Sequence, residues 1–284
     1  MKGNLRSTST SGFTAAAVGM CLETLLADPQ RCDATEFARV AQASSAAGFR
    51  HVGLWLWRVA EMGIPTARTI LDDAGVSVRL TECRIRWADG PDAAVEGLEE
   101  ELDKVEALGA EMILAIAKPT ELDLSQAAEG FGALCERAAT RGVRATIEFI
   151  PCRALRDLAT AWEVVRRSGA ANGGLDLDLM HWQNQIGGPD FDLLRRIPAQ
   201  HVHYVQVCDA VQPAPALDDY ISTALHARPV PGDGIVDIPA FLGALGEIGA
   251  DPFFAMEVFN ADLAAGGPES MAVRLRQSAD ALFD

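Results

Sequence analysis

Short apolar runs alternate with amphipathic stretches along nearly the whole chain, and this alternation predicts strands and helices in turn. The apolar runs are rich in β-branched and aromatic residues, which favour strands. The amphipathic stretches close on glycines such as Gly48, Gly75, Gly109 and Gly142, which are typical helix stop signals. The expected strands cover residues 13–20, 49–57, 76–85, 112–117, 143–150, 174–180, 202–207 and 253–259. The expected helices cover residues 34–47, 65–74, 92–108, 124–140, 155–168, 191–196, 238–248 and 269–282.

This order of elements predicts an α/β fold built as a single (β/α)8 TIM barrel. Strict alternation requires a parallel sheet, and eight units in 284 residues give about 35 residues each, which suits a closed barrel. No linker or change of composition divides the chain, so we expect one domain over 1–284 with a flexible N-terminus at 1–11. An open doubly wound sheet is the alternative, but no GxGxxG motif comes after the first strand to support it.

The charge balance narrows the range of partners. With 24 basic and 40 acidic side chains the formal charge is −16, which repels polyphosphate and anionic lipid, so we expect no nucleic-acid and no membrane partner. No run approaches the roughly 18 apolar residues of a membrane span.

The six cysteines show no CxxC pair or zinc-site spacing, which favours free thiols in a reducing compartment and predicts a soluble, cytoplasmic protein. The acidic stretch 96–103 is interpreted as a solvated helix face. A homo-oligomer is compatible with the sequence, which leaves the oligomeric state open.

Four oxygen-bearing side chains lie in or at the end of the last four expected strands: Glu148, Asp178, Gln206 and Glu257. Active sites of TIM barrels lie at the carboxyl ends of the strands, so these residues should converge. An unpaired carboxylate in an apolar strand is costly to bury, and a cation offsets that cost. Oxygen ligands suit Mn²⁺ or Mg²⁺, so we predict a shared divalent metal held by these four residues. Separate pairing of each acid with an arginine or a backbone amide is the alternative.

The order of these residues along the chain also carries a family resemblance. Glu148 is followed by the D-x-x-H sequence Asp178-Leu179-Met180-His181, then by Gln206, by Arg228-Pro229-Val230-Pro231-Gly232-Asp233-Gly234, and by Glu257. This series resembles the sugar phosphate isomerase/epimerase group of the xylose-isomerase-like TIM-barrel superfamily. The resemblance extends over about residues 45–270 and is specific in the C-terminal half.

The resemblance implies roles for individual residues. Glu148, Asp178 and Glu257 would bind the metal, and His181 and Arg228 would contact substrate oxygens. Glu148 and Glu257 would also act as opposed acid and base on a sugar-like substrate. A metal that chelates a carbonyl and the adjacent hydroxyl acidifies the intervening C–H, so a carboxylate can remove that proton to leave a metal-stabilised enediolate.

The sequence departs from the family pattern at three places. Gln206 stands where the family usually has a histidine ligand; His203 lies three residues away, and strand alternation points it to the opposite face, so Gln206 is preferred as the ligand. Arg153 stands where the epimerases carry an acid, which indicates an anionic or differently oriented substrate. The stretch 210–227 is inserted before Arg228, and it could form a lid, a subunit contact or an ordinary surface excursion.

Other polar and aromatic residues at expected strand ends have less specific interpretations. Four tryptophans could stack on a substrate or pack in the core: Trp55, Trp57, Trp87 and Trp182. Of these, Trp57 is predicted to contact substrate. Glu82 and Lys118 are interpreted first as structural salt-bridge residues, with substrate contact as the alternative. Gly232 and Gly234 are expected to allow a tight loop after Arg228.

The function predicted first is a divalent-metal-dependent isomerase or epimerase acting on a sugar, a sugar derivative or a hydroxy-ketone. The runner-up is a metal-dependent lyase, either a dehydratase or a C-glycoside-cleaving enzyme, because both reactions begin with the same enolate. A nuclease of the same superfamily is disfavoured by the five histidines and the charge of −16. A non-catalytic barrel that binds a ligand is the remaining alternative.

Overall fold

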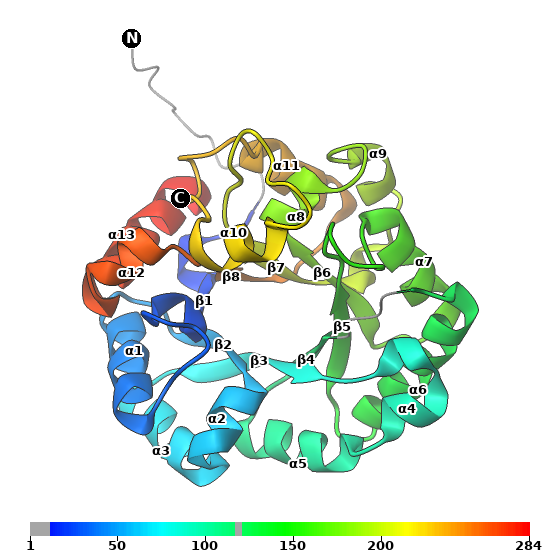
Figure 1. Ribbon diagram of the computed structural model, residues 1–284, viewed down its shortest axis with the longest axis horizontal. Helices are drawn as coiled ribbons and strands as arrows, with labels where there is room; N and C mark the ends of the chain where they lie inside the picture. The colour runs from blue at the N-terminus through cyan, green and yellow to red at the C-terminus, as the bar shows by residue number, and fades with distance from the viewer. Residues whose placement is uncertain (1–11, 117–120) are drawn as a thin grey trace.

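The described residues form a closed barrel of eight parallel strands in chain order (Figure 1). The computed structural model describes residues 12–116 and 121–284, so the expected flexible segment 1–11 and Lys118 lie outside the described residues. The strands are β1 (Gly19–Cys21), β2 (His51–Trp55), β3 (Ser77–Arg84), β4 (Met112–Ile116), β5 (Arg144–Glu148), β6 (Gly173–Asp178), β7 (Val202–Val207) and β8 (Phe253–Met256). β1 pairs with both β2 and β8, which closes the barrel and confirms the predicted TIM-barrel fold.

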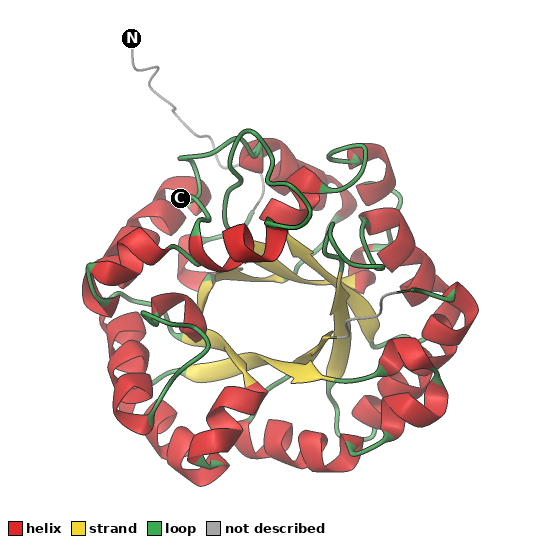
Figure 2. Ribbon diagram, viewed as in Figure 1, coloured by secondary structure: helices red, strands yellow, loops and turns green. Residues whose placement is uncertain are grey.

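Helices surround the barrel as an outer ring (Figure 2). They are α1 (Ala34–Ala46), α2 (Leu56–Met62), α3 (Ile64–Ala74), α4 (Pro91–Val95), α5 (Leu98–Leu108), α6 (Leu124–Ala139), α7 (Leu158–Ser168), α8 (Leu179–Asn184), α9 (Phe191–Leu194), α10 (Tyr220–His226), α11 (Ile238–Ile248), α12 (Ala261–Ala265) and α13 (Pro268–Phe283). Short 3₁₀ turns are η1 (Ala15–Ala17), η2 (Leu22–Leu25), η3 (Trp87–Asp89) and η4 (Ala199–His201).

The helix ends agree with the local sequence. The side chain of Asp157 accepts the backbone N–H of Thr160 and caps the start of α7, which satisfies one of the orphan donors of the first turn. Gly75 and Gly109 end α3 and α5 in the left-handed conformation, with φ of 68° and 70°. These helix ends are confirmed because only glycine adopts that conformation without a steric cost.

Several boundaries differ from the sequence prediction. The strand expected at 13–20 is wrong in most of its length, because Ala15–Ala17 form a 3₁₀ turn and β1 covers only Gly19–Cys21. The helix expected at 92–108 is two helices, since Gly97 adopts a left-handed φ of 68° between α4 and α5. Three short helices after strands were not predicted: α2, α8 and α12. The stretch 210–227, expected to be partly helical, contains α10.

The interior of the barrel is apolar at one level and polar above it. Leu80, Met112, Leu114, Tyr204 and Ala255 pack together inside the sheet and fill its lower part. The larger apolar core lies between the strands and the surrounding helices. Toward the carboxyl ends of the strands, the buried interior side chains become acids and amides, so the apolar layer forms the floor of a polar site.

The outer surface accounts for much of the acidic excess. Acids of α5 are exposed and pair with nearby cations: Arg141 binds Glu99, Asp103 and Glu106. The solvated helix face predicted for this stretch is therefore confirmed.

All six cysteines carry free thiols. Among the described residues, no helix combines the length and the apolar character needed to cross a bilayer.

Candidate active site

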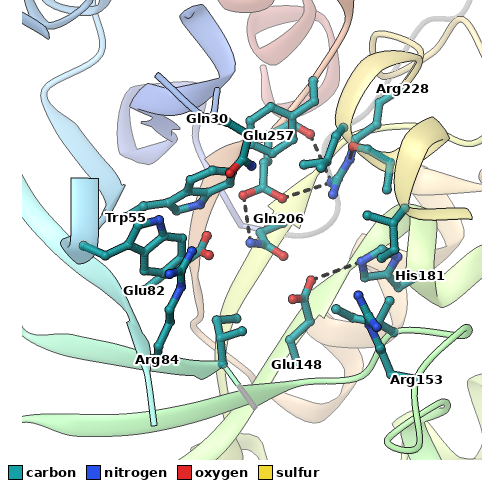
Figure 3. Close-up of a pocket in the computed structure, with 17 residues that line it drawn as sticks. Gln30, Trp55, Glu82, Arg84, Glu148, Arg153, His181, Gln206, Arg228 and Glu257 are labelled. Atoms are coloured by element: carbon teal, nitrogen blue, oxygen red, sulfur yellow. Dashed lines mark hydrogen bonds and ion pairs between the residues drawn. The ribbon is translucent and has the colours of Figure 1, made fainter. Parts of the chain in front are cut away.

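A cavity of about 160 Å³ opens at the carboxyl ends of the strands (Figure 3). Seven of the eight site residues predicted from the sequence line it: Trp57, Glu148, Arg153, His181, Gln206, Arg228 and Glu257. Asp178, the eighth, is fully buried directly behind Arg228 and His181 and does not line the cavity. The structure thus brings the sequence-predicted residues into one place.

The alternation of side chains along each strand places these residues at the cavity. Side chains alternate between the two faces of each strand. Glu148 at the end of β5 and Gln206 near the end of β7 both lie on the face that points into the barrel. Glu257 comes directly after β8, and its backbone N–H donates to the carbonyl of Val207 at 3.1 Å, which continues the strand pairing. His203 lies toward the other end of β7, where its ring nitrogen Nε2 is 3.0 Å from the carbonyl of Gln200. Of the two alternative ligands on this strand, only Gln206 faces the cavity.

Arg228 occupies the centre of the acidic cluster. Its Nη1 forms an ion pair with Asp178 and lies 3.0 Å from Oε2 of Glu257, while its Nε donates to the carbonyl of Ala224 at 2.7 Å. Burial disfavours the ionised form of Asp178, but the charge of Arg228 and the hydrogen bonds that Asp178 accepts from Arg228 and from the backbone N–H of His181 outweigh burial and hold its pKa below the ordinary value. Asp178 is therefore an ionised carboxylate that helps to fix the guanidinium.

Glu148 and His181 form a pair at one side of the cavity. Nε2 of His181 lies 3.4 Å from Oε1 of Glu148, and Nδ1 lies 3.0 Å from the hydroxyl of Tyr220. Burial lowers the pKa of His181 to about 4, so the imidazole is neutral near pH 7. Burial, with the charges of Asp178 and Glu257, raises the pKa of Glu148. A neutral imidazole next to a carboxyl group of raised pKa is suited to proton transfer.

Gln206 and Glu257 form a second pair. Nε2 of Gln206 donates to Oε1 of Glu257 at 2.9 Å, and burial raises the pKa of Glu257 to about 7. The amide oxygen of Gln206 is buried and has no hydrogen-bond partner in the described part of the chain. A buried acceptor without a donor is costly, and a cation would satisfy it.

The donor set therefore fits a divalent cation. Glu148, Asp178 and His181 bring possible ligand atoms within 4.8 Å of one another, and Cys21, Glu82 and Glu257 do the same. Together with Gln206, these groups offer mainly oxygen ligands in a strongly acidic interior. Oxygen ligands and excess negative charge favour a divalent metal there.

The inserted stretch 210–227 forms part of the cavity wall. Its helix α10 places Ile221, Ala224 and Leu225 against the cavity, and the hydroxyl of Tyr220 on His181. The segment is therefore not an ordinary surface excursion. No apolar periodicity in the sequence indicates this placement.

The loop after Arg228 is held by a single carboxylate. Gly232 has a φ of 94°, which confirms the tight loop, and the amides of Gly232, Gly234 and Val236 donate to Asp209. Asp209 also accepts the N–H of Ala210. The amides of this loop thus bind an anion that belongs to the chain itself.

Sequence reasoning missed several buried polar residues near the site: Cys21, Glu23, Asp176 and Tyr220. Arg84, which ends β3 and lines the cavity, was also missed. Asp176 could have been found, because strand alternation puts it on the same face as Asp178.

The tryptophans divide between core and site. Trp87 donates its indole N–H to the carbonyl of Ala115, and Trp182 packs against Phe241, so both belong to the core. Trp55 and Trp57 line the cavity instead.

A closed barrel of eight parallel strands with acids at their carboxyl ends defines a TIM barrel with a candidate active site. More narrowly, the chain belongs to the xylose isomerase-like TIM barrel family, whose model matches residues 41–281. The family resemblance seen in the sequence is thereby confirmed.

Two curated relatives carry the same name. The chain is 31% identical over 183 residues to a 3-dehydroshikimate dehydratase of Pseudomonas aeruginosa, a match covering 63% of this chain and 28% of that protein. It is 26% identical over 204 residues to a 3-dehydroshikimate dehydratase of Pseudomonas putida, covering 68% of this chain and 31% of that protein. The match thus spans less than a third of the length of either relative.

Solved structures share the fold. A xylose isomerase-like TIM barrel/4-hydroxyphenylpyruvate dioxygenase fusion protein superposes with a TM-score of 0.74 at 21% identity, covering 94% of this chain and 41% of that one. The IOLI protein with a bound zinc atom gives 0.72 at 15% identity, covering 85% and 92%. A D-allulose 3-epimerase from Methylomonas gives 0.67 at 15% identity, covering 92% and 95%. At these identities the likeness shows the fold alone.

Proposed function

We propose that the chain is a divalent-metal-dependent lyase that eliminates water from a hydroxylated cyclic keto acid such as 3-dehydroshikimate. The observation that carries this proposal is the oxygen-rich site with the free amide oxygen of Gln206, found in a chain whose two curated relatives are both named as dehydratases. Among the comparisons, the isomerase or epimerase function predicted first has support from fold likeness only. The lyase, the runner-up from the sequence, is therefore preferred.

The reaction is balanced without an oxidant. In 3-dehydroshikimate a ketone adjoins a carbon that bears both hydrogen and hydroxyl, and the next ring carbon bears a second hydroxyl. A base removes the hydrogen next to the ketone, and the second hydroxyl departs with a proton as water. The ring gains a double bond, and enolisation of the ketone gives 3,4-dihydroxybenzoate.

The acidic cluster supplies the metal position. Glu148, Gln206 and Glu257 line the cavity and would hold the ion, with Asp178, which pairs with Arg228 directly behind the cavity, as the fourth predicted ligand. When bound, a divalent cation polarises the ketone and acidifies the neighbouring C–H. Mn²⁺ and Mg²⁺ are the ions that this oxygen-rich set favours.

The chain's own groups move the protons. His181 is neutral, with Nε2 directed toward Glu148, so this pair can accept a proton from carbon and return one to the departing hydroxyl. Arg228 holds Glu257 in place and carries a positive charge that favours an oxyanion in the transition state. The mostly buried site limits competition from water.

An isomerase or epimerase remains the second candidate because of one observation. Glu148 and Glu257 lie on either side of Gln206 (Figure 3), the placement expected for two acid–base residues that act from opposite faces. The two functions differ in the fate of the enolate after proton removal, so the product distinguishes them.

The experiment is an absorbance assay for the aromatic product. Purified protein is incubated with 3-dehydroshikimate and Mn²⁺, Mg²⁺ or a chelator, and Glu148→Gln and Glu257→Gln are compared with Glu247→Gln, whose exposed carboxylate pairs with Arg195. We expect metal-dependent product formation that both site variants lower by about a hundredfold or more and the control leaves unchanged. Absence of product with every ion would overturn the proposal, as would equal activity of the site variants and the wild type.

A further inference from the structure

Charge is segregated by depth along the cavity. Glu82, Glu148 and Glu257 are almost wholly buried, whereas Arg153 is half-buried and Arg84 is exposed. Arg84 and Arg153 both line the cavity (Figure 3). The inner end is therefore acidic, and the basic groups lie toward solvent.

Within residues 12–116 and 121–284, these two arginines lack the carboxylate partners that most of the other arginines have. Neither guanidinium forms an ion pair with a described residue, although the chain carries a charge of −16. By contrast, Arg86, two residues after Arg84, pairs with both Asp89 and Glu96. Arg84 and Arg153 thus bring to the cavity two positive charges that no described carboxylate neutralises.

An aromatic stack holds Arg84 in place. Its guanidinium carbon lies 4.3 Å from the ring centroid of Trp57, and Trp57 stacks on Trp55 at 5.2 Å with an angle of 26° between the rings. A cation–π contact orients a guanidinium through its face. Such a contact leaves the five N–H donors at the edge of the group free to bind an oxyanion.

We propose that Arg84 and Arg153 form a carboxylate subsite at the mouth of the cavity, which orients a ring-shaped acid with its ketone and hydroxyls inward. This inference rests on the proposed function and names the groups that select its substrate. The buried acids would repel a carboxylate at the inner end, while a ketone and hydroxyls fit there beside Gln206 and Arg228. A sugar without a negative charge leaves this subsite unused.

Two ligands that differ only in the carboxylate test the subsite by binding alone, without catalysis. The binding of 3,4-dihydroxybenzoate and of catechol, which has the same ring and hydroxyls without the carboxylate, is measured by calorimetry on protein loaded with Mn²⁺. We expect the wild type to favour the acid by at least about tenfold, since a charged hydrogen-bonded pair contributes that much or more. No measurable binding of the acid, or equal binding of the two ligands, would overturn the subsite.

Substitutions of Arg84 and Arg153 test whether these residues cause the preference for the acid over catechol. Arg84→Gln and Arg153→Gln should each reduce the preference several-fold and leave the affinity for catechol unchanged. Arg84→Lys should give an intermediate value, because it keeps the charge but loses the planar fork. Arg86→Gln is the matched control, since it removes a positive charge outside the cavity. A full wild-type preference in both glutamine variants would contradict the proposal.

The outcomes distinguish the subsite from the proposed function. If the protein forms no aromatic product but its preference for the acid depends on Arg84, the lyase assignment fails and the subsite stands. If product forms while the preference is absent, the subsite fails and the lyase stands.

Discussion

The hydroxyl of Tyr220 lies 3.0 Å from Nδ1 of His181, which joins the inserted helix α10 to the centre of the site. The same hydroxyl donates to the carbonyl of Met180 at 3.4 Å. Because its one proton is directed there, we infer that the hydroxyl accepts from Nδ1–H and that Nε2 is the unprotonated nitrogen. That nitrogen faces Glu148, so Tyr220 sets the tautomer that can accept a proton.

Removing this hydroxyl should slow catalysis more than it weakens binding. Tyr220→Phe keeps the ring and its packing but lets the imidazole turn and change tautomer, so we expect kcat to fall about tenfold with KM nearly unchanged. Steady-state kinetics over a pH series measure both constants. Ser222→Ala, an exposed change on the same helix, is the control and should match the wild type. An unchanged kcat in Tyr220→Phe would show that the tyrosine has only a packing role.

Gln206 should determine metal affinity. Gln206→Leu removes the free amide oxygen and the donor to Glu257, so we expect Mn²⁺ to bind at least about tenfold more weakly in a calorimetric titration. Gln206→His should retain binding, because imidazole is also a metal ligand. The exposed Gln126→Leu serves as the control. Equal Mn²⁺ affinity in the Leu variant and the wild type would remove Gln206 from the ligand set.

The buried acid Glu23 should make the stability of the chelator-treated protein depend on pH. Burial raises the pKa of Glu23 from 4.5 to about 7, although the N–H of Trp55 donates to it. The folded state then binds the proton more tightly than the unfolded chain. The stability that this provides is complete below pH 4.5 and is lost as the pH rises through about 7.

Glu23→Gln isolates this effect. The rise in pKa corresponds to about 3 kcal/mol. The free energy of unfolding of the variant minus that of the wild type should therefore increase by about this amount as the pH rises from 4.5 to 7.5. Urea titrations at several pH values measure it. His181 and His203, with pKa values lowered to about 4, act in the opposite direction and cancel in the comparison. A difference that does not change with pH would contradict this account of Glu23.

Asp209 should stabilise the loop after Arg228. Its carboxylate accepts four backbone amides at 2.8 to 3.0 Å, so Asp209→Ala should lower the free energy of unfolding by about 3 kcal/mol in urea titrations. Asp233→Ala removes an exposed ion pair with Arg274 in the same region and should cost less than about 1 kcal/mol. Similar values for the two variants would show that the buried carboxylate is not the anchor.

The strands and the acids at their ends could be predicted because both depend on a period of two. Glu148 and Gln206 lie at or near the ends of strands whose alternation already places them on the inner face of the barrel. Barrel geometry then brings strands that are distant in the chain to one rim. The convergence of these residues required no knowledge of their contacts.

The remaining parts of the site depend on contacts that leave no periodic signal. Tyr220 lies in a segment without apolar periodicity, and its role arises only when α10 folds over His181. Arg84 has the pattern of an ordinary basic strand end until its stacking on Trp57 is seen. Gly97 splits a helix that is amphipathic on both sides of it, which the pattern alone could not reveal.

Proton NMR in deuterated water tests the central claim most directly. Protein loaded with Mg²⁺, a diamagnetic ion that leaves the signals sharp, is mixed with 3-dehydroshikimate, and the products are monitored over time beside a chelator-treated sample. The account predicts aromatic signals of 3,4-dihydroxybenzoate that appear only with the metal and depend on Glu148 and Glu257. An isomer or epimer that gains deuterium and keeps every hydroxyl would contradict it.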